Sequence, residues 1–104
     1  MDNLEKIKNI IIEEADPVKI ILFGSRARGN YREDSDYDIM VLVNTPYKDG
    51  HVADNIYRSL FRNRVKCSTD VLVTSPDRFS ELSADAGLVY KIIKEEGKVI
   101  YESV

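Results

Sequence analysis

Apolar residues recur along the chain with two different periods, and these periods divide it into predicted helices and strands. Over residues 3–15 they recur at intervals of three and four, at Leu4, Ile7, Ile11 and Ala15. This spacing predicts an amphipathic helix. Asp16-Pro17 ends it, because proline lacks a backbone N–H and disfavours helical geometry in the residue before it. Residues 18–23 are apolar and rich in β-branched side chains, which favours a strand.

The remaining elements follow from the same periodicities and from turn-forming residues. In chain order they are one helical turn in 25–29, a strand over 36–43, a loop at 44–50, a helix through 52–61, a strand within 68–75, a helical segment from 75 to 97 that breaks within 83–87, and a strand at 98–102. A long helical connection between the second and third strands favours a parallel pair joined in the right-handed sense. The predicted fold is a single α/β domain over residues 1–104, with a small mixed β-sheet and flanking helices.

The second predicted strand begins with two carboxylates. Side chains on a strand alternate between faces, so Asp36 and Asp38 point to the same side, about 6.5–7 Å apart along the backbone. Both faces of the strand become apolar after Asp38, which indicates a central strand that is covered on both sides. Ionised carboxylates that enter such a sheet are costly unless a charge partner compensates them. Mg²⁺ suits this position, because it prefers oxygen ligands and binds through carboxylates together with substrate phosphates.

A third carboxylate, Asp70, opens the apolar run of the third strand. If the second and third strands are neighbours, Asp70 lies about 4.8 Å to the side of the second strand. Three carboxylates at one end of a sheet can hold two metal ions about 3.5–4 Å apart. Such a pair of ions stabilises both the attacking and the leaving oxygen of an in-line phosphoryl displacement.

Gly24 and Ser25 close the first strand, with ten residues between Ser25 and the Asp-X-Asp motif. Glycine permits a close backbone approach, and serine offers a hydroxyl and a backbone N–H to an anion. A helical turn that begins here favours phosphate at its N-terminus, and Arg26 and Arg28 can add charge-assisted contacts. Each motif alone is usually a plain turn or a solvated strand start. Together with Asp70, they indicate a nucleoside triphosphate site between the two strands.

These motifs resemble those of the minimal nucleotidyltransferase family, within the DNA polymerase β-like nucleotidyltransferase superfamily. The superfamily pattern is Gly-Ser, roughly ten residues, and then Asp-X-Asp, and here "GSRARG" and "SDYDIMVLV" match it. The later "TDVLVTSPDRF" is similar to the third strand of the family, which carries the last carboxylate at Asp70. The closing "EEGKVIYE" also resembles the end of these small proteins. The resemblance implies a nucleotidyltransferase fold, like the palm of polymerase β.

The resemblance also implies a role for each residue. The ligands of two Mg²⁺ ions would be Asp36, Asp38 and Asp70. Asp70 would in addition help to deprotonate the acceptor hydroxyl. The triphosphate would be held by Gly24, Ser25 and Arg26. The implied reaction transfers a nucleoside monophosphate, AMP from ATP, to a hydroxyl group and releases pyrophosphate, with most of the catalysis supplied by electrostatic stabilisation.

Members of this family often work with a separately encoded helical partner of the HEPN type. In such toxin–antitoxin pairs the nucleotidyltransferase acts as antitoxin and is similar to enzymes that adenylylate a tyrosine of the toxin. The resemblance therefore implies an antitoxin that modifies a HEPN-type partner. Two alternatives stay open: a non-catalytic nucleotide-binding antitoxin that acts by occlusion, and the catalytic subunit of a two-chain transferase for small molecules. The sequence also leaves open whether the chain forms a homo-oligomer.

Composition limits the binding partners and the cellular compartment that are expected for this activity. The net charge of −3 and the sequence pI near 5.1 provide no global basic field, which disfavours non-specific nucleic-acid binding. No apolar run approaches the roughly 20 residues needed to span a bilayer, so no membrane contact is expected. A single cysteine, Cys67, excludes an intrachain disulfide and fits a reducing compartment. The protein is therefore expected in the cytoplasm.

Overall fold

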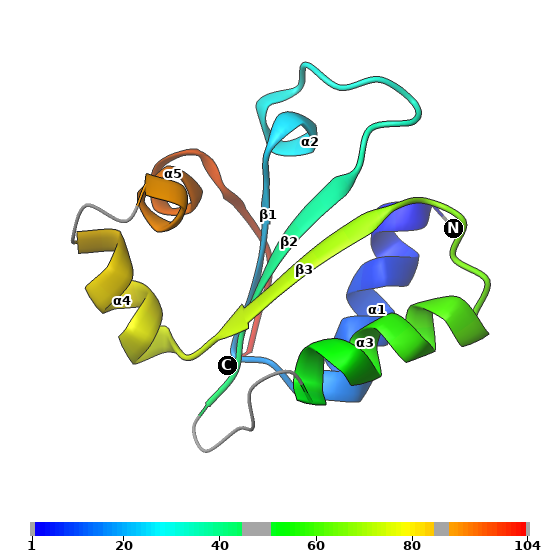
Figure 1. Ribbon diagram of the computed structural model, residues 1–104, viewed down its shortest axis with the longest axis horizontal. Coiled ribbons are helices and arrows are strands. Elements are labelled where there is room, and N and C mark those ends of the chain that lie inside the picture. The colour runs from blue at the N-terminus through cyan, green and yellow to red at the C-terminus, as the bar shows by residue number, and fades with distance from the viewer. Residues whose placement is uncertain (1, 45–50, 85–87, 104) are drawn as a thin grey trace.

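One four-stranded sheet organises the chain, with helices on both of its faces (Figure 1). The computed structural model describes residues 2–44, 51–84 and 88–103. Its elements are α1 (Asn3–Ala15), β1 (Lys19–Phe23), α2 (Ser25–Arg28), β2 (Tyr37–Leu42), α3 (His51–Arg62), β3 (Thr69–Thr74), α4 (Pro76–Ala84), α5 (Leu88–Glu96) and β4 (Lys98–Glu102). The predicted loop at 44–50 and the predicted break at 83–87 fall largely outside the described residues. None of the described helices is both long enough and apolar enough to cross a membrane.

The ends of α1 are set by the residues next to them. The Oδ1 atom of Asp2 accepts a hydrogen bond from the backbone N–H of Glu5 at 2.8 Å and so caps the N-terminus. At the C-terminus, Asp16 adopts a left-handed conformation with a φ of 46°, and its N–H donates to a carbonyl of the last turn at 3.1 Å. Pro17 follows directly. The predicted helix over residues 3–15 and its predicted end are therefore confirmed.

The sheet has the strand order β3-β2-β1-β4. β2 and β3 run parallel and are connected through α3, whereas β1 is antiparallel to both of its neighbours. This arrangement confirms the predicted mixed sheet and the predicted parallel pair. β2 begins at Tyr37 and ends at Leu42, one residue inside the predicted strand at each end.

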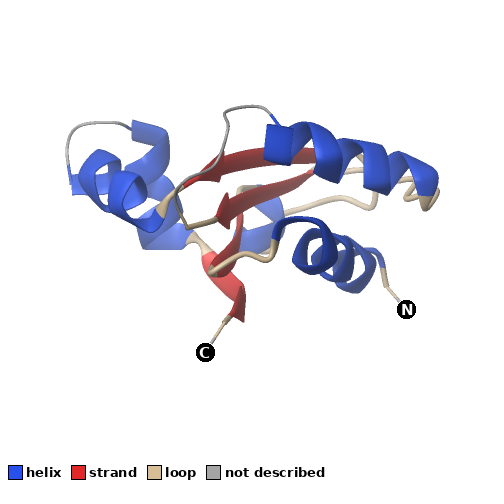
Figure 2. Ribbon diagram, turned by 90° about the horizontal axis from the view of Figure 1, so that it is seen from below, coloured by secondary structure: helices blue, strands red, loops and turns tan. Residues whose placement is uncertain are grey.

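β2 lies inside the core, and its two faces meet different helices (Figure 2). One face carries Ile39 and Val41 and packs against α1 and α3. The other face carries Met40 and Leu42 and packs against α5. Ile39, Met40 and Val41 have no exposed surface, which confirms that this strand is covered on both sides.

Helix α3 departs from its predicted pattern at Phe61. Ile56 and Leu60 are buried as expected, but Phe61 is 85 % exposed. One position along a helix corresponds to a rotation of about 100°, so Phe61 leaves the face that Leu60 shares with Ile56. The apolar pattern that predicts this helix groups Phe61 with Val52, Ile56 and Leu60, so the placement of Phe61 on the buried face is wrong.

Candidate active site

The parallel pairing of β2 and β3 brings two of the predicted carboxylates side by side. In the register of these strands, Asp38 is the direct partner of Asp70. Paired positions on neighbouring strands place their side chains on the same face, with the strands about 4.8 Å apart. That face is the one that carries Met40 and Leu42, next to α5. Asp38 is half-buried and Asp70 is exposed, so the pair opens to solvent where both strands begin.

Gly24 lies against the carboxylate of Asp38. β1 runs antiparallel to β2, and its last residue, Phe23, pairs with Asp38. A Cβ atom on Gly24 would overlap Oδ2 of Asp38 and come within 3.1 Å of its Cγ. Gly24 also has a φ of 73°, which residues with a side chain rarely adopt. Glycine is therefore required here for two reasons, and the Gly-Ser and Asp-X-Asp motifs are in direct contact.

Ser25 is the first residue of α2, so it directly follows the contact between Gly24 and Asp38. Its carbonyl accepts a hydrogen bond from the N–H of Gly29 at 3.0 Å, and Gly29, with a φ of 89°, ends the helix. The predicted helical turn in residues 25–29 is confirmed. Because α2 has only 4 residues, it contributes the position of the Ser25 hydroxyl and backbone rather than a substantial helix dipole.

Asp36 is exposed and lies one residue before β2. The next N–H, that of Tyr37, donates to the carbonyl of Ser68 at 2.9 Å, which anchors this point of the chain at the start of β3. Burial raises the pKa of the Asp38 carboxyl above its ordinary value, and the charges of Asp70 and Asp36 raise it further. The charges of Asp36 and Asp70 therefore both act on the Asp38 carboxyl.

The carboxylate oxygens of Asp36, Asp38 and Asp70 are donors of the kind that Mg²⁺ prefers. In the part of the chain that the structure describes, no group of three or more His, Cys, Asp or Glu side chains is close enough together to hold a metal ion. Asp36, Asp38 and Asp70 therefore do not form a closed protein cage. Mg²⁺ seldom uses such a cage, because it keeps several waters and binds through one or two carboxylates and the phosphates of a substrate. A donor set of carboxylate oxygens agrees with that chemistry.

Arg26, the third predicted triphosphate ligand, contacts the opposite face of β2 from Asp38 and Asp70. Its Nε and one terminal nitrogen donate to the carbonyl of Ser35 at 3.2 and 3.0 Å, and the terminal nitrogen also donates to the carbonyl of Glu33 at 2.9 Å. The guanidinium lies over the rings of Tyr31 and Tyr37, 4.4 and 4.2 Å from their centroids. Tyr37 belongs to the face of β2 that packs against α1. The structure therefore does not bring the Arg26 side chain to Asp38 and Asp70, and its role at the triphosphate stays a prediction.

Arg28 is the basic side chain whose charge acts on Asp38. Its charge lowers the pKa of Asp38 and so opposes the larger effects of burial and of the neighbouring aspartates. Two positions along a helix correspond to a rotation of about 200°, so Arg26 and Arg28 leave α2 in nearly opposite directions. The sequence contains both arginines but not the orientation of α2, and for this reason it does not identify the one that faces Asp38.

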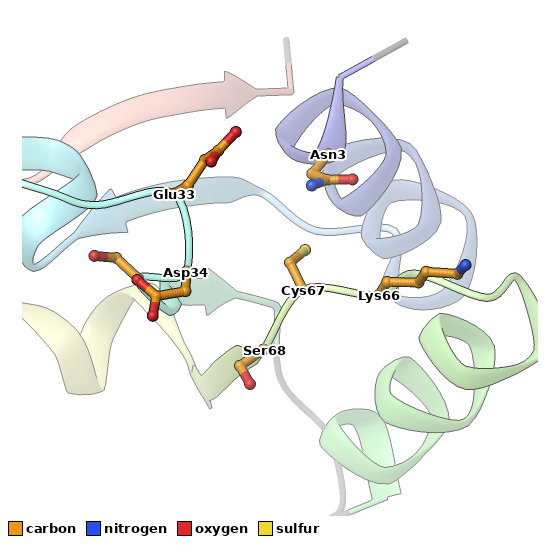
Figure 3. Close-up of a pocket in the computed structure, with 7 residues that line it drawn as sticks. Asn3, Glu33, Asp34, Lys66, Cys67 and Ser68 are labelled. Atoms are coloured by element: carbon orange, nitrogen blue, oxygen red, sulfur yellow. The ribbon is translucent and has the colours of Figure 1, made fainter.

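A separate cavity lies beside the loop that leads into β2 (Figure 3). Its volume is about 360 Å³, and it is lined by Asn3, Glu33, Asp34, Ser35, Lys66, Cys67 and Ser68. In Figure 3 the sulfur of Cys67 points toward Asn3 at the start of α1. None of the predicted site residues is among the lining residues, so this cavity is distinct from the edge where Asp38 and Asp70 meet.

Residues 5–103 match the protein family described as "Polymerase beta, Nucleotidyltransferase". The chain belongs to this family. Over 83 residues this nucleotidyltransferase is 34% identical to a protein of Methanocaldococcus jannaschii that is provisionally named protein adenylyltransferase MJ0604. The similar region covers 80% of this chain and 77% of the relative. The resemblance carried by "GSRARG" and "SDYDIMVLV" is therefore confirmed, and the protein is an enzyme of the nucleotidyltransferase class.

Solved structures show the same fold. A crystal structure of a toxin–antitoxin with AMP-PNP has a TM-score of 0.63 and 19% identity, over 99% of this chain and 75% of the other. A provisionally assigned nucleotidyltransferase of Sulfolobus solfataricus has a TM-score of 0.60 and 19% identity, over 96% and 78%. A mutant of the MntA–HpeT toxin–antitoxin has a TM-score of 0.60 and 18% identity, over 99% and 75%. At these identities the similarity establishes the nucleotidyltransferase fold.

Proposed function

We propose that this nucleotidyltransferase transfers AMP from ATP to a hydroxyl group of a partner protein. The observation that carries the proposal is the contact of Gly24 with Asp38 together with the pairing of Asp38 with Asp70. These contacts gather a phosphate-binding motif and two carboxylates at one end of the sheet. The relative named as a protein adenylyltransferase supports the choice of AMP and of a protein as the acceptor.

Each residue of the site has a proposed task. The metal ligands are Asp36, Asp38 and Asp70. The Gly24 backbone and the Ser25 hydroxyl hold the triphosphate. Arg28 places positive charge beside Asp38, where the phosphates would lie. When bound, two Mg²⁺ ions supply the charge that stabilises the attacking and leaving oxygens of an in-line displacement.

The proposed reaction exchanges one phosphorus–oxygen bond for another. The acceptor oxygen bonds to the α-phosphorus of ATP while the bond from that phosphorus to the pyrophosphate oxygen breaks. Asp70 receives the proton of the acceptor hydroxyl, because it is exposed at the start of β3 whereas Asp38 is half-buried against Gly24. Positioning and electrostatic stabilisation supply most of the rate enhancement, as in phosphoryl transfer generally.

The proposed partner is a helical HEPN-type toxin that offers a tyrosine hydroxyl. Two of the solved structures with the same fold are toxin–antitoxins, and one of them is a structure with AMP-PNP. Adenylylation of the tyrosine would neutralise the toxin, so this chain would act as the antitoxin. Because the reaction consumes ATP, the pair would work in the cytoplasm.

A second candidate is an antitoxin that neutralises its partner by occlusion. The two toxin–antitoxin structures with the same fold support it as well, because a stable complex can neutralise a partner without covalent transfer. The two candidates differ in one measurable property, the covalent mass of the neutralised partner.

The test is intact-mass spectrometry of the co-purified partner after incubation with ATP and Mg²⁺. The wild-type protein should add mass in steps of one AMP, and a chelator should prevent the addition. Asp36→Asn should still bind the partner but leave its mass unchanged. Asp34→Asn, which alters an exposed carboxylate of the same loop, is the matched control and should retain transfer. If Asp36→Asn neutralises the partner as well as wild type and no adduct forms, occlusion is the correct function.

A further inference from the structure

We propose that Arg26 is a positioning residue that holds the loop between α2 and β2 in shape and so sets the place of Asp36. The proposal rests on the proposed function, because it concerns how the metal-binding carboxylates are placed relative to Ser25. It assigns Arg26 a task that does not require contact with the substrate. The same contacts explain why its side chain points away from Asp38 although Arg26 follows Ser25 directly.

The contacts of Arg26 lie on both sides of Asp36. On the N-terminal side, the guanidinium donates to the carbonyls of Glu33 and Ser35 at 2.9 to 3.2 Å. On the C-terminal side, it lies 4.2 Å from the ring centroid of Tyr37, the first residue of β2. A single side chain of α2 therefore fixes the residue before Asp36 and the residue after it.

The segment that Arg26 holds is itself a closed turn. The N–H of Arg32 donates to Oγ of Ser35 at 2.8 Å, and the N–H of Ser35 donates to the carbonyl of Arg32 at 3.0 Å. The N–H of Tyr37 then attaches the end of the turn to Ser68 at the start of β3. Through these contacts, Arg26 connects α2, which carries Ser25, to the start of β2, which carries the carboxylates.

The contacts require a guanidinium rather than any positive charge. The group is planar, so it can donate to two carbonyls in its plane while its face covers an aromatic ring. Lysine keeps the charge but has neither the fork of donors nor the flat face. Because the Nε atom and one terminal nitrogen are directed at loop carbonyls, those donors are not available to a phosphate in this conformation.

The experiment compares Arg26→Lys and Arg26→Gln with wild type. Arg32→Lys is the matched control, because its exposed side chain lies in the same loop and its contacts with Ser35 are made by backbone groups that the substitution keeps. The first measurement is amide hydrogen exchange of residues 30–37 in the nucleotide-free protein. Both Arg26 variants should exchange about tenfold faster or more at the amides of the turn, as expected for lost hydrogen bonds to a charged group, and the control should not.

The second measurement is AMP transfer to the partner alongside binding of ATP with Mg²⁺. Misplaced carboxylates should lower transfer by about a hundredfold in both Arg26 variants, whereas the affinity for ATP should fall much less. Rescue by Arg26→Lys with unchanged loop exchange would overturn the proposal, because it would identify Arg26 as a charge that contacts phosphate. If both variants show unchanged hydrogen exchange but lose affinity for ATP, the proposal is also overturned, because Arg26 would then act by contacting phosphate.

Tyr31→Ala provides a further test that does not depend on the folding of the Arg26 variants. The Tyr31 side chain is 49% exposed, so its removal leaves the core intact, but it takes away one of the two rings that the guanidinium contacts. Exchange in the turn should rise, and unchanged exchange would count against the proposal. If wild type transfers no AMP at all, the proposed function fails, but the exchange measurements still decide whether Arg26 holds the loop.

Discussion

The two faces of β2 differ in how far along the strand they are covered. On the α1 and α3 side, burial begins with the first residue, Tyr37, and a cluster of buried apolar side chains continues along Ile39 and Val41. On the α5 side, full burial begins only at Met40, and the position before it is the half-buried Asp38. The first face can therefore supply most of the stability of the domain. The second face can hold charged groups at its open end, because the stability gained by apolar burial on the first face offsets the free-energy cost of partly burying them.

The largest expected effect is the loss of AMP transfer in Asp38→Asn. The substitution removes a proposed metal ligand, so transfer should fall by at least about a hundredfold, measured as AMP-sized mass on the partner. The free energy of unfolding should be unchanged or higher, because burial and two neighbouring carboxylates disfavour the ionised form of Asp38. Strong destabilisation of Asp38→Asn in a denaturant titration would show that the open end of this face does contribute to stability.

A substitution at Ile39, one position along the strand and on the other face, should have the opposite effect: it should lower stability and leave transfer intact. Ile39 is fully buried in the cluster formed with α1 and α3, so Ile39→Ala should lower the free energy of unfolding by about 2–5 kcal/mol. Urea unfolding measures this value, and Ile39→Val should cost only about 0.5–1.5 kcal/mol. Transfer per folded molecule should be retained at low temperature. Specific loss of transfer in fully folded Ile39→Ala would mean that the two faces are not separable.

A smaller effect is expected at the contact between the motifs. Gly24→Ala places a Cβ atom against Oδ2 of Asp38 at a positive φ, which should cost about 1–3 kcal/mol of stability. Asp38→Ala removes the carboxylate that the new methyl group meets. The double variant should therefore be more stable than the sum of the single changes implies, with a coupling of about 0.5–3 kcal/mol in a double-mutant cycle. Strict additivity would indicate that the two residues do not touch.

The smallest expected effect is a pH dependence of stability in the nucleotide-free protein. The pKa of Asp38 is raised from its ordinary value of 3.8, so the folded state binds this proton more tightly than the unfolded state. Stability should therefore fall as the pH rises from 3.8 through the raised pKa of Asp38. The difference between wild type and Asp38→Asn in urea midpoint, measured across weakly acidic pH, isolates this contribution from those of other carboxylates. A difference that is constant with pH would contradict it.

Local sequence determined the elements and the candidate chemistry. The apolar spacing over residues 3–15, with Asp2 before it and Pro17 after it, contains the signals that begin and end α1. The connection through α3 is long enough for a crossover, so the parallel pairing of β2 and β3 could also be predicted. The carboxylates could also be predicted, because a charged residue at the start of an apolar run can be identified from the amino-acid sequence alone.

Only the tertiary structure decided which of these groups meet. Strand register depends on how whole faces pack, and a shift of one residue would turn Asp38 to the other side of the sheet. The observed register places Asp38 beside Asp70 and against Gly24, and it leaves Asp36 in the loop. The orientation of α2 likewise follows from its packing rather than from its four residues. That orientation directs Arg26 to the loop and places the charge of Arg28 near Asp38. The short motif contains both arginines, so the sequence alone does not show which of them faces the carboxylate.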